Sequence, residues 1–591
     1  MVHRSARLGL IAILVLSILS VPALATDGVS GAGSSQLLWA TALAWLVPVG
    51  LGLVACGAVP PGHVARVIRL GWLALAVSVI GYWLCGFAFQ FGGIGFVVDQ
   101  PDLAGLVRQW TWAPIAASWG TQWGMLGLEG YMLRGPASTP AALALFLSQL
   151  PWITTAVALP LWSLQGRTRA VVLFMSGITI AFLYSLIGHW TWGGGWLANL
   201  GLNLGWGHGF VDWGGAGAVH LAGAATALAG MLAFGTRASA RSRVEQLALP
   251  TVNVAQTGEG DVFRVAQDGE TYVPMPPLHL PILATLGAWL VLVGWIGWGQ
   301  STPVRVASGL EMAWAEFGIG LMLAAAGGAA ASLAFSWLTT GQANALMTAR
   351  GVTAAIVAAS AGLPFLPFWA ALAVGAGAGL LVPLGQYAIE HVLRLDDPTS
   401  AIATHGLPAL WGLLAVGLFA DGGAGQAWNR VGRGAYLGVD GQGITGRLPA
   451  AGYANDWPGQ FQAQLTGSIA LCLSAFFASW LLFAVVQGLT RAWHGEYTVR
   501  LPRHPRLKQP RPRRRAYRGP RIRFVRASTS EPQASEEPTP SAGASLIRTL
   551  AERSKGWIQA LRARIRRSSD RRQEQVAGET EGSAETHDGP L

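Results

Sequence analysis

The chain has 591 residues, of which 52% are hydrophobic and 12% are charged. Because soluble domains carry about 25% charged residues, this composition excludes an ordinary soluble protein and indicates long apolar segments that lie in a membrane. The net charge of +11 does not indicate nucleic-acid binding, because the basic residues concentrate after residue 495, as is typical of a cytoplasmic tail.

Residues 1–25 have the pattern of a signal peptide. Arg4 and Arg7 precede an apolar run that ends at Ala23-Leu24-Ala25, a small-x-small cleavage pattern. An uncleaved first helix is the alternative interpretation. In either case we expect the following segment to begin outside the cell.

Apolar runs that are long enough to cross a bilayer, about 17–25 residues each, recur along the rest of the chain. We expect eleven spans near residues 36–57, 69–95, 140–164, 170–190, 212–235, 277–300, 307–337, 345–363, 367–393, 401–420 and 460–491. With an external start, the arginines at 66, 69, 167, 169, 237, 241, 243 and 394 then fall on inside loops, as the positive-inside rule requires. The pattern predicts a multi-pass protein of the cell membrane with its mature N-terminus outside and its C-terminus in the cytoplasm.

Eleven spans divide into five, five and one, and an odd number of spans in each repeat inverts the second repeat relative to the first. We therefore predict an all-α membrane protein over residues 26–495, with two inverted five-helix repeats and a final helix. Two external loops, a Trp-rich one near 98–138 and a Gly-rich one at 421–458, are expected to cap the outer face.

The C-terminal region is different in composition. Residues 496–544 form a basic, Pro-rich cytoplasmic linker, whose stretch 500–526 we expect to lie against anionic lipid headgroups. Residues 545–568 have the spacing of a basic amphipathic helix, which docks on the membrane surface or on a partner helix. A disordered tail is expected over 569–591. The three cysteines lie in apolar segments and indicate neither a disulfide nor a metal framework.

Ionisable residues inside a membrane span are costly and therefore mark functional sites. His220 lies in the fifth span and His405 in the tenth. One such histidine is as often a hydrogen-bonding residue between helices, but two at matching positions favour a shared axial site. Asp212 lies eight residues before His220, where it is expected first to cap the helix and second to attract a cation. Trp192 is either an interfacial belt residue or a cation–π acceptor.

Several motifs together resemble the ammonium transporter/Rhesus family, on its ammonium transporter branch. They are His189 followed by Trp192-Gly-Gly-Gly-Trp-Leu, Asp212-x-Gly-Gly-x-x-x-Val219-His220, Asp396-Asp397-Pro398 followed by His405-Gly406, and Gly294-Trp295-Ile296-Gly297-Trp298. The resemblance covers residues 36–491 and implies the ammonium transporter fold, a homotrimer with one pore in each subunit, and ammonium or ammonia as the substrate.

The resemblance also implies roles for particular residues. Trp192 would bind the cation at an outer vestibule, and His220 and His405 would form a hydrogen-bonded pair inside the pore. At the entrance gate, where the family has phenylalanines, this sequence has Trp152 and Trp298, whose indoles bring more bulk and more N–H donors. The hydroxyl that helps to bind the cation would be Thr302, or Ser301 if the register differs by one.

The mechanism that the resemblance implies is transport without covalent chemistry. A bare ammonium ion loses its hydration in an apolar pore at a cost of several kcal/mol, which favours passage as ammonia, with or without a separate proton relayed by the imidazoles. No enzymatic activity, metal or cofactor is expected.

This sequence departs from the family pattern at two charged positions. Glu316 is expected to be a solvated vestibule residue or an extra cation site, and Arg350 is expected to extend to the inner interface. The start of the tail keeps only His494-Gly495-Glu496-Tyr497 of the family pattern, so a PII-type regulator is an open alternative.

Two other functions compete with transport. The long tail also fits an ammonium sensor with little transport that signals through residues 500–591. The second is a membrane enzyme that holds a metal between Asp212, His220 and His405. The sequence offers no further cluster of metal ligands to support it.

Overall fold

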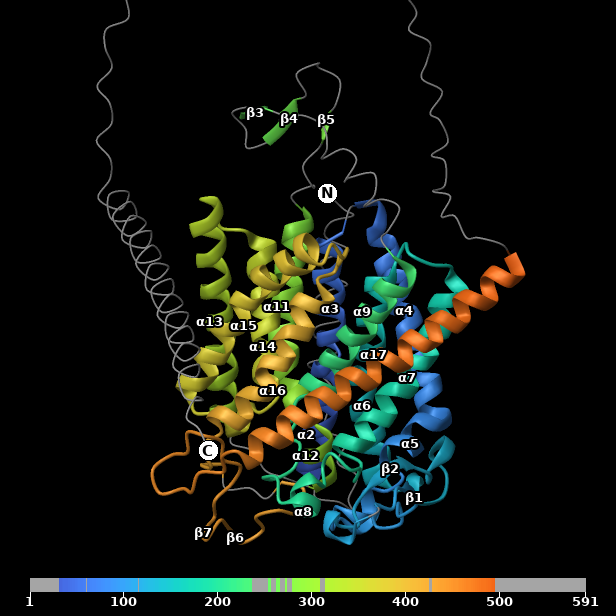
Figure 1. Ribbon diagram of the computed structural model, residues 1–591, viewed down its shortest axis with the longest axis vertical. Coiled ribbons are helices and arrows are strands. Elements are labelled where there is room, and N and C mark those ends of the chain that lie inside the picture. The colour runs from blue at the N-terminus through green and yellow to red at the C-terminus, as the bar shows by residue number, and fades with distance from the viewer. Residues whose placement is uncertain are drawn as a thin grey trace, which may run out of the picture. The chain divides into compact units, whose positions relative to one another are not determined.

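The computed structural model describes residues 31–59, 61–114, 116–235, 253–256, 262–265, 272–273, 279–308, 314–424 and 428–494. The signal peptide expected at 1–25 and the tail segments expected after 495 lie outside the described residues. The described part of the chain is a bundle of membrane-length helices, and the segments that hold β1, β2, β6 and β7 lie at one end of it (Figure 1).

Helices account for most of the described residues. The helices that build the bundle are α2 Gly31–Ala44, α3 Leu46–Gly57, α4 Pro61–Gly81, η1 Tyr82–Gly86, α5 Phe87–Phe91, α6 Pro140–Leu164, α7 Ala170–Thr191, η7 Ala216–Leu221, α9 Ala222–Phe234, α11 His279–Gln300, α12 Pro303–Ser308, α13 Trp314–Thr340, α14 Ala345–Ser360, α15 Phe368–Tyr387, η9 Ala388–Val392, η10 Ala401–Gly406, α16 Leu407–Phe419 and α17 Gly459–His494. Here η1, η7, η9 and η10 are π-helices, each continuous with an α-helix.

Ten of the described helical segments are long and apolar enough to cross a membrane. They correspond to ten of the eleven spans expected from hydropathy. The remaining expected span, 345–363, coincides with α14, a shorter apolar helix of 16 residues. Helix α14 packs against α13, α15 and α16, so it belongs to the bundle although its length alone does not identify a span.

Glycine allows several helix pairs to approach closely. Where α3 meets α11, a Cβ on Gly50 would lie 2.5 Å from the Gly287 carbonyl oxygen, and a Cβ on Gly287 would lie 2.5 Å from the Gly50 carbonyl oxygen. Only glycine at both positions permits this backbone-to-backbone contact, which is how small residues hold helices together in lipid.

Two spans are buried far more than the others. In Pro140–Leu164 and Ala216–Phe234, 78% of the residues of the apolar window are buried, against 22% in Gly459–Leu489. The first two therefore form the centre of the bundle, and they carry Trp152 and His220. Helix α17 instead runs obliquely across the outside of α7, α9 and α16 (Figure 1).

Strands occur only outside the spans in the described residues. A hairpin of β1 Gln109–Thr111 and β2 Gly124–Gly127 lies in the Trp-rich loop, and β6 Ala435–Tyr436 pairs with β7 Val439–Asp440 in the Gly-rich loop. A three-stranded sheet of β3 Asn253–Gln256, β4 Val262–Val265 and β5 Tyr272–Val273 forms between α9 and α11.

The two long loops cover one end of the bundle, as expected. Trp190 at the end of α7 donates its indole N–H to Met125 O at 2.9 Å, which ties the hairpin to the helix. In the other loop, Trp428 contacts the ring of Trp213 at 6.0 Å, and Gln464 of α17 holds the backbone of Val211 through two hydrogen bonds of 2.8 and 2.9 Å.

Candidate functional site

The helix that carries His220 begins with a capped π-turn. Gly215, which directly precedes η7, has φ +76°, a conformation that glycine adopts without strain. The Asp212 carboxylate accepts the backbone N–H groups of Gly217 at 3.0 Å and Ala218 at 2.9 Å. Asp212 thus caps the helix as its position predicts, and π-helical turns of this kind are frequent at functional sites.

The helix that carries His405 repeats this arrangement with different residues. Asp397 also lies eight residues before its histidine, and its two oxygens accept the N–H groups of Ala401 and Ile402, both at 2.9 Å. The turn into η10 has φ +56° at Ser400, which costs more than it does for glycine. Ser400 donates its hydroxyl to Gln386 at 2.6 Å, a contact that helps to hold this strained turn.

The two histidine rings lie side by side in the buried centre. Their centroids are 5.1 Å apart and their planes differ by 8°. His220 is fully buried and His405 is 5% exposed. The hydrogen bond expected between the rings is not present: both ring nitrogens of His220 and Nδ1 of His405 lack a hydrogen-bond partner among the described residues. The two ring planes are nearly parallel, but neither ring donates a hydrogen bond to the other.

An unbroken series of aromatic rings leads from the histidines towards the capped end. His220 stacks on Trp295 at 5.7 Å, Trp295 on Trp298 at 5.1 Å, and Trp298 on Trp152 at 4.4 Å with planes 12° apart. Trp192 then meets the edge of Trp152 at 5.6 Å. We call these four tryptophans and two histidines the aromatic column.

Trp295 is a member of this column that the sequence reasoning missed. Trp295 and Trp298 are three residues apart on α11 and so share one face of that helix. This spacing could have indicated that Trp295 belongs to the site, but it is equally typical of two tryptophans that only pack against a neighbouring helix. Trp295 is 1% exposed and is the ring that links the entrance tryptophans to His220.

Three of the four indole N–H groups of the column are bonded to protein atoms. Trp298 donates to Gly214 O at 2.9 Å, Trp192 donates to Asp212 O at 2.9 Å, and Trp152 donates to the Ser301 hydroxyl at 3.4 Å. The extra donors expected at the entrance therefore fasten the rings in place, and they do not point into an open path.

The two candidate hydroxyls have different surroundings. The Ser301 hydroxyl accepts the Trp152 indole N–H at 3.4 Å and donates to the backbone carbonyl of Trp298 at 3.2 Å, so it contacts the ring of one tryptophan and the backbone of the other. Thr302 precedes α12 and its hydroxyl accepts the Arg305 N–H at 3.4 Å, as a helix cap does. Both are fully buried.

The capping carboxylate of the first motif carries a charge that is only partly compensated. Burial raises the pKa of Asp212 to about 6, although hydrogen bonds from backbone N–H groups oppose this shift. One of its oxygens, Oδ1, has no hydrogen-bond partner among the described residues. Asp212 also accepts the Trp192 indole N–H through its backbone carbonyl, so one residue both caps η7 and holds the Trp192 ring.

The capping carboxylate of the second motif lies among cations. Arg350 of α14 donates to Pro398 O at 3.3 Å and is close enough to act electrostatically on both Asp397 and His405. Arg350 is 7% exposed, so the expectation that it extends to the inner interface is wrong. The guanidinium turns inwards because the Asp397 carboxylate and the Pro398 carbonyl attract it.

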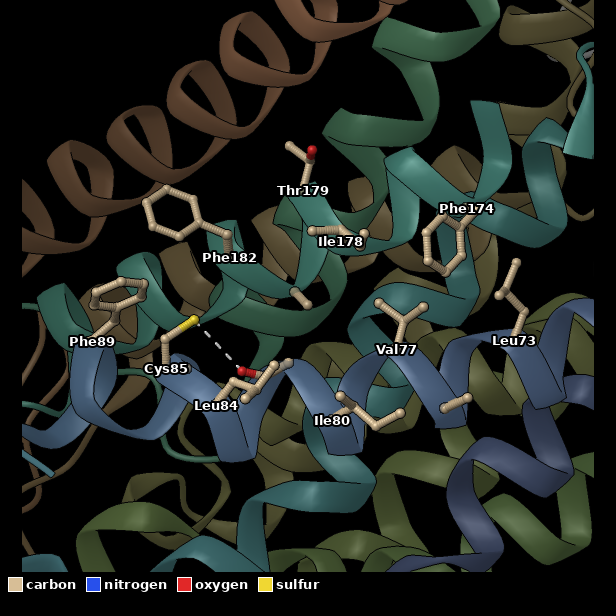
Figure 2. Close-up of a pocket in the computed structure, with 14 residues that line it drawn as sticks. Leu73, Val77, Ile80, Leu84, Cys85, Phe89, Phe174, Ile178, Thr179 and Phe182 are labelled. Carbon is tan, nitrogen blue, oxygen red and sulfur yellow. Dashed lines mark hydrogen bonds between the residues drawn. The ribbon is translucent and has the colours of Figure 1, made fainter. Parts of the chain in front are cut away.

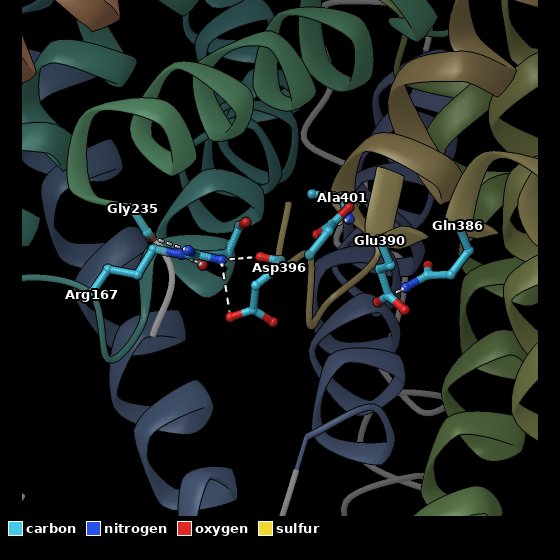
Figure 3. A network of polar contacts seen from close by, with 8 residues as sticks. Arg167, Gly235, Gln386, Glu390, Asp396 and Ala401 are labelled. Carbon is cyan, nitrogen blue, oxygen red and sulfur yellow. Dashed lines mark hydrogen bonds and ion pairs between the residues drawn. The ribbon is translucent and has the colours of Figure 1, made fainter. Parts of the chain in front are cut away.

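Arg167 belongs to the same end of the bundle. Its guanidinium lies 3.5 Å from the Asp396 carboxylate and also donates to the backbone carbonyls of Asp396 and Gly235 (Figure 3). These contacts join the ends of α6 and α9 to the segment that precedes η10. On the opposite side of this segment, Gln386 donates to Glu390 (Figure 3).

Two charged groups near the capped end lie outside the aromatic column. Glu316 and Asp421 line a separate cavity of about 440 Å³.

In the Gly-rich loop, Tyr436 donates its hydroxyl to Asp456 at 2.9 Å and packs on His208 at 4.2 Å. Burial lowers the pKa of His208 to about 4, so this ring is neutral at physiological pH.

A metal-holding arrangement is not found in the described ranges, where no three His, Cys, Asp or Glu side chains cluster suitably. In the set considered for a metalloenzyme, the Asp212 carboxylate bonds to the backbone of Gly217 and Ala218, whereas His220 and His405 contact each other.

The chain matches proteins of one family over most of its length. Residues 35–258 and 272–491 match the model of the Ammonium Transporter Family. Ammonium transporter Amt2 of Archaeoglobus fulgidus is 27% identical over 458 residues, which cover 76% of this chain and 82% of that protein. A putative ammonium transporter of Synechocystis sp. is 26% identical over 388 residues, which cover 65% of this chain and 74% of that protein.

Solved structures show the same fold. A structure described as a sensor Amt protein superposes with a TM-score of 0.56 and 20% identity, covering 78% of this chain and 94% of that one. The crystal structure of Candida albicans Mep2 superposes with a TM-score of 0.54 and 19% identity, covering 78% of this chain and 84% of that one. At these identities the likeness concerns the fold alone.

Proposed function

Because the chain belongs to the ammonium transporter family, we propose that it binds ammonium at an external vestibule beside Trp192 and conducts ammonia past His220 and His405. The observation that carries this proposal is the aromatic column, which connects one end of the bundle to the paired imidazoles without interruption.

Binding at the vestibule rests on charge and on the face of an aromatic ring. The Asp212 carboxylate attracts a cation, and an indole face stabilises it by about 0.5–2 kcal/mol. Desolvation beyond this point costs an ammonium ion several kcal/mol. Release of the proton to water at the column entrance avoids that cost, because neutral ammonia is the species that an apolar path accepts.

Passage requires the entrance rings to move. Trp152 and Trp298 stack at 4.4 Å, which leaves no room between them for a molecule. We therefore assign them as the gate, with Ser301 as the hydroxyl that bonds Trp152 when the gate is closed. Beyond the gate, the free nitrogens of His220 can donate to or accept from ammonia in turn, and they can relay a proton separately.

The orientation and assembly are part of the same proposal. The matching Asp-to-His motifs in η7 and η10 support two inverted five-helix repeats with a final helix. We propose an external N-terminus, a cytoplasmic C-terminus and a homotrimer. Contact of the tail with anionic lipid, and binding of a PII-type regulator, are proposals that rest on the sequence of the tail.

The test is transport by purified full-length protein in liposomes under an inward ammonium gradient. Internal pH and current are recorded together, since ammonia flux raises internal pH and ion flux generates current. We expect the unmodified protein to transport. His220→Ala or His405→Ala should either abolish this transport or change which ions carry the current. His208→Ala, which removes a buried imidazole outside the column, is the matched control and should transport normally.

A sensor with little transport gives a different result in the same experiment. Such a protein binds ammonium, which Trp192→Leu weakens, but neither internal pH nor current changes under the gradient. Binding without flux in correctly inserted protein would overturn the transport proposal.

A further inference from the structure

A groove outside the aromatic column runs along the membrane-spanning helices α4 and α7. It has a volume of about 560 Å³ and continues along the π-helix η1 into α5 (Figure 2). Apolar side chains form both walls: Leu73, Val77 and Leu84 on one side, and Phe174, Ile178 and Phe182 on the other. The two helices are in contact along this line, as Val77 lies beside Gly177.

The few polar atoms in the groove are bonded to their own helices. Cys85 Sγ donates to Gly81 O at 3.7 Å, and the Thr179 hydroxyl donates to Met175 O at 3.2 Å. No polar group in the groove therefore needs a ligand as a partner. The part of a ligand that enters must be apolar, because a polar group there would lose its hydration without a compensating hydrogen bond.

The two ends of the groove differ. At one end Phe89 and Phe182 meet edge to face at 5.4 Å and close it (Figure 2). At the other end lie Leu73 and Phe174 (Figure 2), and the exposed Arg69 precedes Leu73 by one helical turn on the same face of α4. Arg66 lies a further turn back. The groove is therefore apolar and closed at one end, and it opens towards cations at the other.

We propose that this groove binds one acyl chain of an anionic phospholipid, whose phosphate pairs with Arg69 at the open end. Both walls belong to segments that cross the membrane, so lipid chains are the solvent that surrounds the groove. The basic rim adds the charge complementarity that favours an anionic headgroup over a zwitterionic one. Basic sites between helices at the membrane surface recognise lipid headgroups in this way.

The site is independent of the conduction path. None of its lining residues belongs to the aromatic column, and the proposal requires only that the described helices span a membrane. Its test therefore needs no measurement of transport, and failure of one proposal leaves the other standing.

The experiment uses full-length protein in vesicles that contain phosphatidylglycerol or phosphatidylcholine with a photoreactive group near the end of one acyl chain. After illumination, labelled peptides from α4 and α7 are compared with labelled peptides from α17. We expect phosphatidylglycerol to label the groove peptides more than phosphatidylcholine does, and both lipids to label α17 equally.

Two pairs of variants separate the parts of the site. Ala76→Phe fills the groove, and Ala478→Phe places the same side chain on the exposed face of α17. We expect the first to remove most groove labelling and the second to leave it intact. Arg69→Gln should lower phosphatidylglycerol labelling about fivefold, the factor for losing one cation beside an anionic headgroup, whereas Arg134→Gln in the Trp-rich loop should not.

Three outcomes would overturn the proposal. Equal labelling by the two lipids would mean that the groove holds ordinary boundary lipid. Undiminished labelling in Ala76→Phe would mean that the label reports another surface. Labelling of the groove peptides by neither lipid, while α17 is labelled, would mean that protein covers the groove.

Discussion

Replacing Trp298 by phenylalanine should raise the rate of ammonium uptake. In the closed arrangement this ring donates an N–H bond of 2.9 Å to Gly214 O and stacks on Trp152 at 4.4 Å. Phenylalanine removes the hydrogen bond, which contributes about 1 kcal/mol, and weakens the stacking by about 0.5 kcal/mol. If passage requires these contacts to break, the barrier falls by about 1.5 kcal/mol, and uptake rises about tenfold.

The assay compares initial uptake and equilibrium binding in the same liposome preparations. Trp298→Phe should accelerate uptake and leave binding at Trp192 nearly unchanged. Trp192→Leu should weaken binding by a factor of about 2–30, the range of the cation–π term. Trp213→Phe is the matched control, because Trp213 is equally buried but contacts Phe365 and Trp428 outside the column.

Two results would refute this reasoning. Slower uptake in Trp298→Phe would mean that the ring guides the substrate and does not block it. Equal acceleration in Trp213→Phe would mean that any loosening of the capped end speeds transport.

Three further variants test other parts of the site. Asp212 has a pKa of about 6, so its carboxylate is protonated below that pH; ammonium affinity should fall as the pH drops through 6, and Asp212→Asn should remove this step in a binding titration. Arg350→Gln should raise ammonium-evoked current, because it removes a cation whose repulsion opposes a proton on His405; Arg350→Lys, which keeps the charge, should give the wild-type current. Gly215→Ala should lower the Tm, because alanine is strained at φ +76° and its Cβ would lie 2.9 Å from the Trp152 ring; an unchanged Tm would contradict the tight packing of the gate on η7.

Hydropathy was sufficient to predict most of the bundle because the cost of burying a polar backbone in lipid permits few alternatives to a helix. Ten expected spans have counterparts of membrane length, and α14 is shorter. The spacing between Asp212 and His220 predicted a capped helix, since a carboxylate at that position can reach the first backbone N–H groups. These features are local in sequence, and local patterns report them well.

Side-chain direction was the part that sequence could not supply. Whether Arg350 turns towards lipid headgroups or towards Asp397 depends on a carboxylate 47 residues away in the chain, which no helical periodicity records. The stacking of His220 on His405 and the inclusion of Trp295 in the column depend in the same way on how three separate helices meet. The groove beside α4 arises because α7 packs against it, so neither helix alone predicts it.

The two π-helices that carry the histidines, η7 and η10, affect how this chain should be aligned with its relatives. In terms of alignment, a π-turn is an α-helix into which one residue has been inserted, and each residue of an α-helix turns the chain by about 100°. If η7 lost one residue between Gly215 and His220, the composition of the segment would hardly change, yet the imidazole would rotate away from its partner. The length of the segment between each capping aspartate and its histidine is therefore as strict a signature of this site as the histidines themselves, and a gap placed there by an alignment marks a different site.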